Sequence, residues 1–140
     1  MKILVDTSIW SIALRRKNHT ANEKALADEL KVLIKNLQVV MIGPVRQELL
    51  SGIADQEQYE TLKKRLDLIE DLPIYTEEYE RASLFYNICR AKGVQGSHID
   101  FLICSVAAKY DLPIFTSDKD FYIYAEHLPI TIYQGKHSPY

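Results

Sequence analysis

The chain has 140 residues, 47% hydrophobic and 26% charged, which is typical of one soluble globular domain over residues 1–140. Its 17 basic and 19 acidic residues give a net charge of −2, which excludes a strong overall attraction to polyanions. No apolar run approaches the roughly 18 residues needed to span a bilayer, and no charged leader precedes the first apolar run, so we expect no membrane association. Cys89 and Cys104 lack metal-binding or redox spacing, and they indicate a cytoplasmic protein with reduced thiols.

Charge is unevenly distributed along the chain. Residues 1–40 carry a net charge of +3, residues 41–80 carry −6 and residues 81–140 carry +1. Part of the N-terminal excess lies in Arg15, Arg16 and Lys17, which are candidate contacts for a polyanion. A solvated helix face explains the same residues, and both interpretations stay open.

The predicted elements alternate between short strands and helices. Apolar runs predict strands at residues 3–5, 39–42, 113–115 and 130–132. Helical spacing of apolar residues predicts helices at 26–37, 59–69, 79–89 and 99–110, and a short helix between Pro44 and Gly52. The helix at 99–110 is apolar nearly all round and should be the most buried. This alternation predicts an α/β fold with a mostly parallel sheet and helices on both faces.

Acidic residues follow two of the predicted strands. Asp6, Thr7 and Ser8 come directly after residues 3–5, and the strand at 113–115 is followed by a polar run, Thr116, Ser117, Asp118 and Asp120. Asp100 lies in the first turn of the buried helix, and Glu48 lies about one turn into the short helix. Functional groups of open parallel sheets lie beyond the carboxyl ends of the strands, so these acids are candidates for one site.

Each acid also has a purely structural explanation. Asp6 can cap the helix that starts near Ser8, because Asp is a favoured N-cap residue. The pairs Ser97/Asp100 and Ser117/Asp120 have the spacing of capping boxes, and Glu48 can be a solvated side chain. Capping alone, however, does not require acids at two strand ends and on the most buried helix.

Clustered carboxylates favour a bound cation. Two charges about 4 Å apart at an effective dielectric of roughly 20 repel by on the order of 4 kcal/mol, so the acids must either protonate or recruit a cation. Oxygen ligands without matching His or Cys favour Mg²⁺ or Mn²⁺. Such an ion can activate a water against a phosphodiester, so metal-dependent phosphoryl hydrolysis is the leading hypothesis.

Other chemistries lack their sequence signals. The sequence contains no P-loop, no dinucleotide-binding glycine motif and no nucleophile elbow. Tyr59, Tyr79 and Tyr86 fall at helical spacing with other apolar residues, which predicts core packing for them.

Four segments resemble the PIN domain family, specifically its VapC-type toxins. In chain order they are Val5-Asp6-Thr7-Ser8, Gly43-Pro44-Val45-Arg46-Gln47-Glu48-Leu49-Leu50, Asp100-Phe101-Leu102-Ile103 and Thr116-Ser117-Asp118-Lys119-Asp120-Phe121. The resemblance implies an α/β/α sandwich, Mg²⁺- or Mn²⁺-dependent endoribonuclease activity, a homodimer, and a small cognate antitoxin of a type II toxin-antitoxin pair.

Matched by position, four residues correspond to the acidic quartet of that family: Asp6, Glu48, Asp100 and Asp118. The resemblance implies that these residues hold the metal and are catalytic, with Glu48 orienting water or binding a second ion. Asp120 matches an accessory acid, and Thr7 and Thr116 match hydroxyls that orient the site.

Two alternatives remain at this stage. One is an aspartyl-nucleophile phosphatase using Asp6, although Ser8 stands where such enzymes need a second acid. The other is a catalytically inactive PIN-like binding module, against which the complete quartet argues.

Overall fold

The computed structural model describes residues 1–15 and 17–135, so Arg16 lies outside the described residues. Over these residues the chain forms short strands and longer helices in the order β1 (Ile3–Val5), α1 (Thr7–Leu14), α2 (Ala21–Lys35), β2 (Val39–Met41), α3 (Gly43–Leu50), α4 (Gln56–Leu66), β3 (Glu70–Asp71), α5 (Thr76–Ala91), α6 (His98–Tyr110), β4 (Pro113–Phe115), α7 (Asp120–Tyr124) and β5 (Thr131–Ile132).

The strands form one parallel sheet in the order β3-β2-β1-β4-β5. β1 is the central strand, where Leu4 pairs with Val40 of β2 on one side and with Ile114 of β4 on the other. All three residues of β1 are fully buried, as expected for a strand covered on both faces. The predicted α/β fold with a parallel sheet is confirmed.

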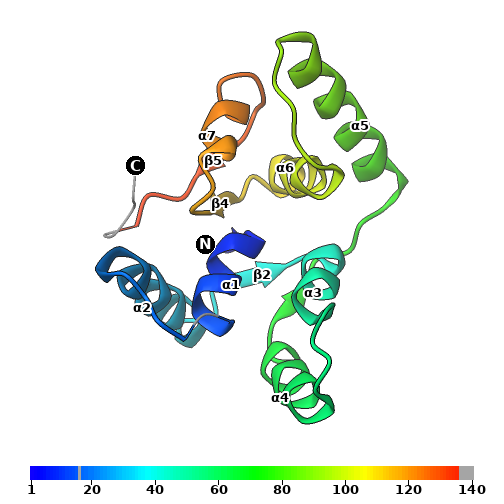
Figure 1. The fold of residues 1–140 in the computed structure, drawn as a ribbon. Helices are drawn as coiled ribbons and strands as arrows, with labels where there is room; N and C mark the ends of the chain where they lie inside the picture. The colour runs from blue at the N-terminus through cyan, green and yellow to red at the C-terminus, as the bar shows by residue number, and fades with distance from the viewer. Residues whose placement is uncertain (16, 136–140) are drawn as a thin grey trace.

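Helices cover the two faces of the sheet as separate layers (Figure 1). In that view α2 and α4 lie below β2, α1 and α3 lie beside it, and α5 to α7 lie above it; the fold is an α/β/α sandwich. From β1, the chain adds β2 and then β3 toward one edge of the sheet, and it later adds β4 and β5 toward the other edge. The boundary between β1 and β4 is therefore the topological switch point, where open parallel sheets place their ligands.

The helix α6 lies against the centre of the core. Its residues 101–107 are buried without interruption, which confirms the prediction for the apolar segment at 99–110. The helix packs closely along α5. Its N-terminal turn reaches the carboxyl end of the sheet, and this places Asp100 at the switch point.

One strand was not predicted from the sequence, and two sequence-based expectations need correction. The strand β3 is an exposed two-residue edge strand without an apolar run, so periodicity does not reveal it. Ser117 does not cap α7, whose N-cap residue is Lys119 without a side-chain capping bond. Tyr79 is 53% exposed rather than packed in the core, and it lines a surface groove.

In the part of the chain that the structure describes, no helix is long and apolar enough to cross a membrane.

Candidate active site

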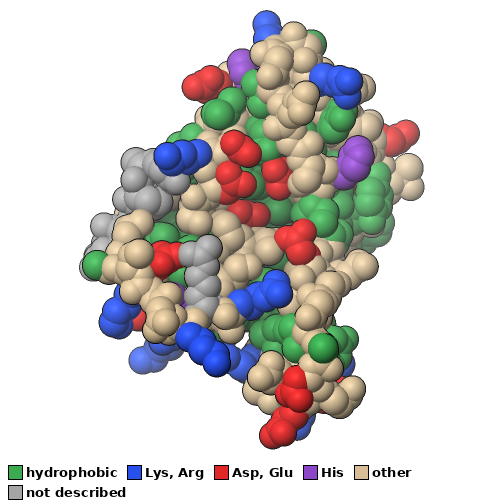
Figure 2. Space-filling model, viewed as in Figure 1, with side chains coloured by type: hydrophobic (Ala, Val, Ile, Leu, Met, Phe, Trp, Pro, Cys, Tyr) green, Lys and Arg blue, Asp and Glu red, His purple; other side chains and the backbone are tan. Residues whose placement is uncertain are grey.

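Three acids converge at the carboxyl ends of the central strands. Asp6 directly follows β1, Asp118 lies three residues beyond β4, and Asp100 comes from the first turn of α6. Figure 2 shows acidic side chains gathered at the middle of one face of the molecule. Parallel pairing of β1 with β4 brings segments more than a hundred residues apart to the same edge of the sheet.

Asp6 is the most buried member of this group. Only 5% of its surface is exposed, and its Oδ2 accepts hydrogen bonds from the Thr116 hydroxyl at 2.9 Å and from the Ser8 amide at 3.4 Å. The pKa of Asp6 is raised to about 6, chiefly by burial and also by the charge of Asp100, and these hydrogen bonds lower it in part. The Ser8 bond caps α1, so Asp6 is both a helix cap and a member of the cluster.

Thr116 joins two of the acids. While its hydroxyl donates to Asp6, its oxygen accepts the amide N–H of Asp118 at 3.0 Å. Asp118 in turn accepts the amide N–H of Asp120 at 2.9 Å through Oδ1. Thr116 is 2% exposed, whereas Asp120 faces solvent. The turn after β4 therefore fixes Asp118 through its backbone and leaves Asp120 at the outer edge.

Asp100 is held by two side chains that lie on either side of it. Ser97 caps α6 and accepts the Asp100 amide at 3.0 Å, while the Tyr124 hydroxyl donates a 2.7 Å hydrogen bond to Asp100 Oδ2. Burial raises the pKa of Asp100, these hydrogen bonds lower it, and the charge of Asp118 raises it. The electrostatic effects of Asp100 on Asp6 and of Asp118 on Asp100 show that the three carboxylates act on one another.

Gly96 makes room for the contact between Tyr124 and Asp100. A Cβ atom at this position would collide with the Tyr124 hydroxyl and lie 2.9 Å from the Phe101 ring. Any larger residue would push Tyr124 away from Asp100. Gly96 is therefore required by a close approach and not by its backbone angles.

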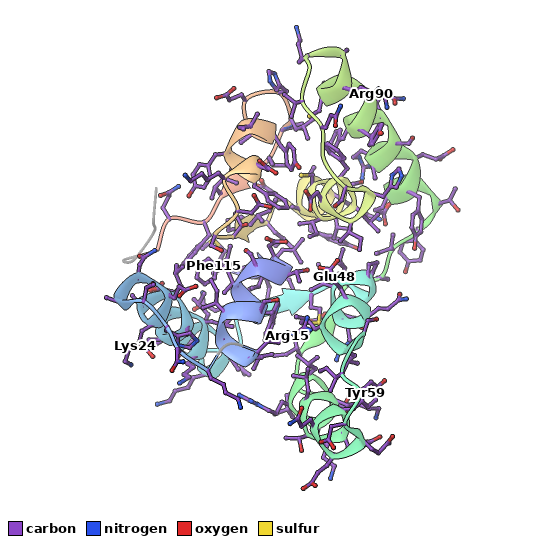
Figure 3. The ribbon with its side chains drawn as sticks, viewed as in Figure 1. Arg15, Lys24, Glu48, Tyr59, Arg90 and Phe115 are labelled. Atoms are coloured by element: carbon purple, nitrogen blue, oxygen red, sulfur yellow. The ribbon has the colours of Figure 1, made fainter. Side chains whose placement is uncertain are left out.

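Glu48 stands apart from the other three acids. It is exposed on α3, and it makes no hydrogen bond or ion pair with any described residue. Figure 3 shows Glu48 on the side of α3 that faces α6, at the border of the acidic face in Figure 2. The side chain is free to reorient toward a ligand, in contrast to the fixed Asp6.

The donor set fits a hard divalent cation that keeps part of its water shell. The Thr7 hydroxyl, next to Asp6, is buried without a hydrogen-bond partner among the described residues. Carboxylate oxygens at mutually repelling positions and an orphaned hydroxyl suit Mg²⁺ or Mn²⁺, which bind through one or two carboxylates and several waters. Within residues 1–15 and 17–135, no group of three or more His, Cys, Asp or Glu side chains is placed so that it could hold a metal ion without side-chain movement.

The predicted polyanion contacts lie at the other end of α1. Arg15 and Lys17 line a groove of about 860 Å³ between α1 and α4. Arg65 lines the same groove together with Asp55 and Glu57, so its charge is mixed. Figure 3 shows Arg15 on the same face as Glu48, and Figure 2 shows basic side chains below the acidic ones.

The arrangement of acids on a parallel sheet agrees with the comparison to known families. The family model described as PIN domain matches residues 3–127. The chain belongs to the PIN domain family. PIN domains are generally nucleases that use a divalent metal. No curated protein matches the sequence.

Solved structures share the PIN fold over nearly the whole chain at low identity. FitAcB from Neisseria gonorrhoeae has a TM-score of 0.73 and 20% identity, covering 94% of this chain and 96% of that one. VapBC2 from Rickettsia felis bound to a promoter DNA fragment has a TM-score of 0.74 and 20% identity, covering 96% and 98%. DNA-bound VapBC from Salmonella typhimurium has a TM-score of 0.69 and 17% identity, covering 95% and 97%.

Sequence reasoning missed the residues that hold the acids in place. Tyr124 and Gly96 position Asp100, and the Ser8 hydroxyl accepts the Ser117 amide at 3.0 Å and lies 3.3 Å from the Thr116 hydroxyl. Ser8 was visible as a polar residue in the first turn after β1. No sequence pattern pointed to Tyr124, because its contact with Asp100 depends on the path of the loop before α6.

Proposed function

We propose that this PIN domain is a Mg²⁺- or Mn²⁺-dependent endoribonuclease that hydrolyses RNA phosphodiester bonds. The observation that carries the proposal is the junction of Asp6, Asp100 and Asp118 at the switch point, with Thr116 bridging two of them. Membership of the PIN family supports nuclease chemistry. Burial and mutual repulsion disfavour the charged forms of these carboxylates, and a bound cation would offset that repulsion.

Each acid has a separate role in this proposal. Asp6, Asp100 and Asp118 hold the cation directly or through water, and Thr116 keeps Asp6 oriented toward it. When bound, the cation supplies Lewis-acid polarisation of the phosphate and lowers the pKa of a coordinated water. Glu48 is exposed and has no hydrogen-bond partner among the described residues. In this proposal it orients the attacking water and accepts its proton, or binds a second ion. Asp120 is an accessory acid at the outer edge of the site, and Thr7 is an accessory hydroxyl buried next to Asp6.

The biological role we propose is that of the toxin in a toxin-antitoxin pair. The similar structures include FitAB and VapBC assemblies, of which VapBC2 from Rickettsia felis is bound to a fragment of promoter DNA and two others are bound to DNA. By analogy, this chain is inhibited by a small antitoxin, forms a homodimer and acts in the cytoplasm.

The RNA path we propose starts at the acidic site and continues toward Arg15 and Lys17. These cations line the groove between α1 and α4, where Arg65 adds a third positive charge. Arg16 carries the same charge, although it lies outside the described residues. Phosphate contacts of this kind position RNA without reading its sequence. Single-stranded or looped RNA fits the open acidic face, because unpaired strands can bend into a shallow site.

A cleavage assay tests the proposed function. The purified protein should cut single-stranded RNA with Mg²⁺ or Mn²⁺ and should lose this activity in EDTA. Asp6→Asn should abolish cleavage while the circular dichroism spectrum stays folded. Cleavage that persists in EDTA, or a phosphoaspartate trapped on Asp6 without RNA cleavage, would contradict the proposal.

A further inference from the structure

We propose that the groove between α3, α5 and α6 binds an unpaired nucleobase of the RNA, next to the phosphate that is cleaved. This inference rests on the proposed function and adds to it a subsite for a base. The groove has a volume of about 640 Å³, which lies in the range of sites that hold small organic groups. It is lined mainly by rings and aliphatic side chains, with amide and hydroxyl groups among them.

Aromatic side chains form the walls of this groove. The His98 and Tyr86 rings stack with centroids 5.3 Å apart and planes 19° apart, and the Phe101 ring meets Tyr86 edge-on at 5.6 Å. Tyr79 also lines the groove and is 53% exposed, which is unusual for a large ring without a partner. A base can stack on such exposed rings, because every base presents a π face.

The polar residues of the groove suit a base better than a phosphate. Gln47, Ser83 and Asn87 contribute two amides and one hydroxyl, which can donate to and accept from base edges. The residues that line the groove include no Lys, Arg, Asp or Glu. The groove therefore offers no positive charge to a phosphate, and an uncharged aromatic group is the better match.

The groove adjoins the acidic site on two sides. Gln47 precedes Glu48 on α3, while His98, Ile99 and Phe101 flank Asp100 on α6. Phe101 also contacts the Tyr124 ring at 4.9 Å, and the Tyr124 hydroxyl binds Asp100. Figure 2 shows hydrophobic side chains directly beside the central acidic ones. A nucleotide whose phosphate lies at the acids therefore has its base within reach of the groove.

Abasic substitution tests this subsite directly. Binding of single-stranded RNA and of matched RNAs with one abasic position is measured by fluorescence anisotropy, in an Asp118→Asn background that slows cleavage. One abasic position next to the scissile bond should weaken binding about tenfold, as expected for the loss of one stacked base. In the additional variant Tyr79→Ala, intact RNA should bind about tenfold more weakly, and the abasic effect should disappear.

Two further variants control this experiment. Tyr79→Phe keeps the ring and should bind intact RNA as the background does. Tyr75→Ala removes another exposed tyrosine near the start of α5 that does not line the groove, and it should keep the full abasic effect. Equal binding of intact and abasic RNA by the background protein would overturn the subsite, even if RNA cleavage is observed.

The same experiment separates the subsite from the proposed nuclease activity. Abasic-sensitive binding that depends on Tyr79, in a protein that cleaves no RNA, would support the subsite and reject the nuclease. If the groove instead holds a second copy of this chain, Tyr79→Ala should lower the molar mass measured by light scattering and leave binding insensitive to abasic positions. That outcome would overturn the subsite.

Discussion

The hydroxyl of Thr116 donates a 2.9 Å hydrogen bond to Oδ2 of Asp6 and so joins the residues that directly follow the neighbouring strands β1 and β4. The same oxygen accepts the amide N–H of Asp118 at 3.0 Å. One buried hydroxyl thus sets the positions of two acids that come from opposite ends of the chain. The candidate site depends on this contact as much as on the acids themselves.

Replacing Thr116 by Val should impair the site with little effect on folding. The variant keeps the shape of the side chain but loses the hydrogen bond to Asp6, which lowers the pKa of that carboxyl in the native protein. We expect cleavage to fall about tenfold, within the range for residues that orient metal ligands. The acidic limb of the pH–rate profile should move to higher pH. Thr116→Ser keeps the hydroxyl and should retain both rate and profile; equal losses in the two variants would contradict the assigned role.

Replacing Asp6 by Asn should stabilise the metal-free protein at neutral pH. Because burial raises the pKa of Asp6 to about 6 in the folded state, the folded chain binds more protons than the unfolded chain between about pH 4 and pH 6. Stability of the native protein therefore falls as pH rises through this window and stays lower above it. At pH 7.5 the Asn variant should be more stable by up to about 3 kcal/mol, and near pH 4 the two should be equal.

Urea unfolding in EDTA between pH 4 and pH 8 measures this difference. Glu57→Gln, which removes an exposed carboxylate on α4, should leave the pH dependence unchanged. Saturating Mg²⁺ should stabilise the native protein but not Asp6→Asn, since only the carboxylate binds the ion well. A less stable Asn variant at pH 7.5 in EDTA would show that burial and the neighbouring acid do not disfavour the charged form of Asp6 in the folded state.

Replacing Tyr124 by Phe should loosen Asp100. The variant removes the 2.7 Å hydrogen bond to Asp100 Oδ2, and this bond lowers the pKa of Asp100 in the native protein. We expect about tenfold slower cleavage and weaker Mg²⁺ binding, with the largest loss at low pH. Tyr133→Phe is a matched control, because it removes a 2.6 Å bond to Glu29 of α2, which is not one of the acids of the site. If both Phe variants cleave equally well, Tyr124 does not position Asp100.

Replacing Arg15 and Lys17 by Gln should weaken RNA binding without changing the chemistry. Both side chains line the groove between α1 and α4, beyond the acidic site. Each lost phosphate contact should reduce the slope of log affinity against log salt by about 0.7, the value for single strands. Lys24→Gln removes an exposed cation of α2 that is paired with Asp28 and should leave the slope unchanged. An unaltered slope in the Arg15/Lys17 variant would place the RNA elsewhere.

Much of the fold was predictable because its central elements carry strong local patterns. The apolar runs at residues 3–5 and 113–115 coincide with β1 and β4, and the apolar helix at 99–110 coincides closely with α6. Since Asp6 and Asp118 follow these two strands and Asp100 lies in the first turn of the helix, their convergence on one edge of the sheet could be expected from the sequence. The strand β3 could not be expected from the sequence, because it is defined by backbone pairing with β2 and not by apolar character.

The long-range contacts within the site could not be predicted from the sequence. Tyr124 reaches Asp100 only because Gly96 leaves room for its hydroxyl, and no spacing rule connects these three residues.

The position of Arg46 in the sequence does not reveal its structural role. It stands in the segment that resembles the family near Glu48, yet its guanidinium binds Asp71 and the carbonyls of Leu66 and Ile69. Its role is to fix α3 against β3, and its ion pair with Asp71 accounts for one acid of the segment 41–80.

The buried Glu78 accounts for another acid of that segment. It pairs with Lys109 at 3.1 Å and accepts the Tyr75 amide at 3.1 Å, which links α5 to α6. Burial raises the pKa of Glu78, but the hydrogen bonds and the Lys109 charge outweigh it, so the pKa is lowered and the group is charged at neutral pH. The acidic composition of residues 41–80 is therefore partly structural.

The central claim is that Asp6, Asp100 and Asp118 hold one catalytic cation. A crystal structure of the protein soaked in Mn²⁺, with anomalous diffraction data, tests it most directly. The account predicts an anomalous peak between these three carboxylates, close to the Thr7 hydroxyl, that disappears in Asp6→Asn crystals. A fully occupied Mn²⁺ elsewhere on the molecule, with no peak at the carboxyl ends of β1 and β4, would contradict it.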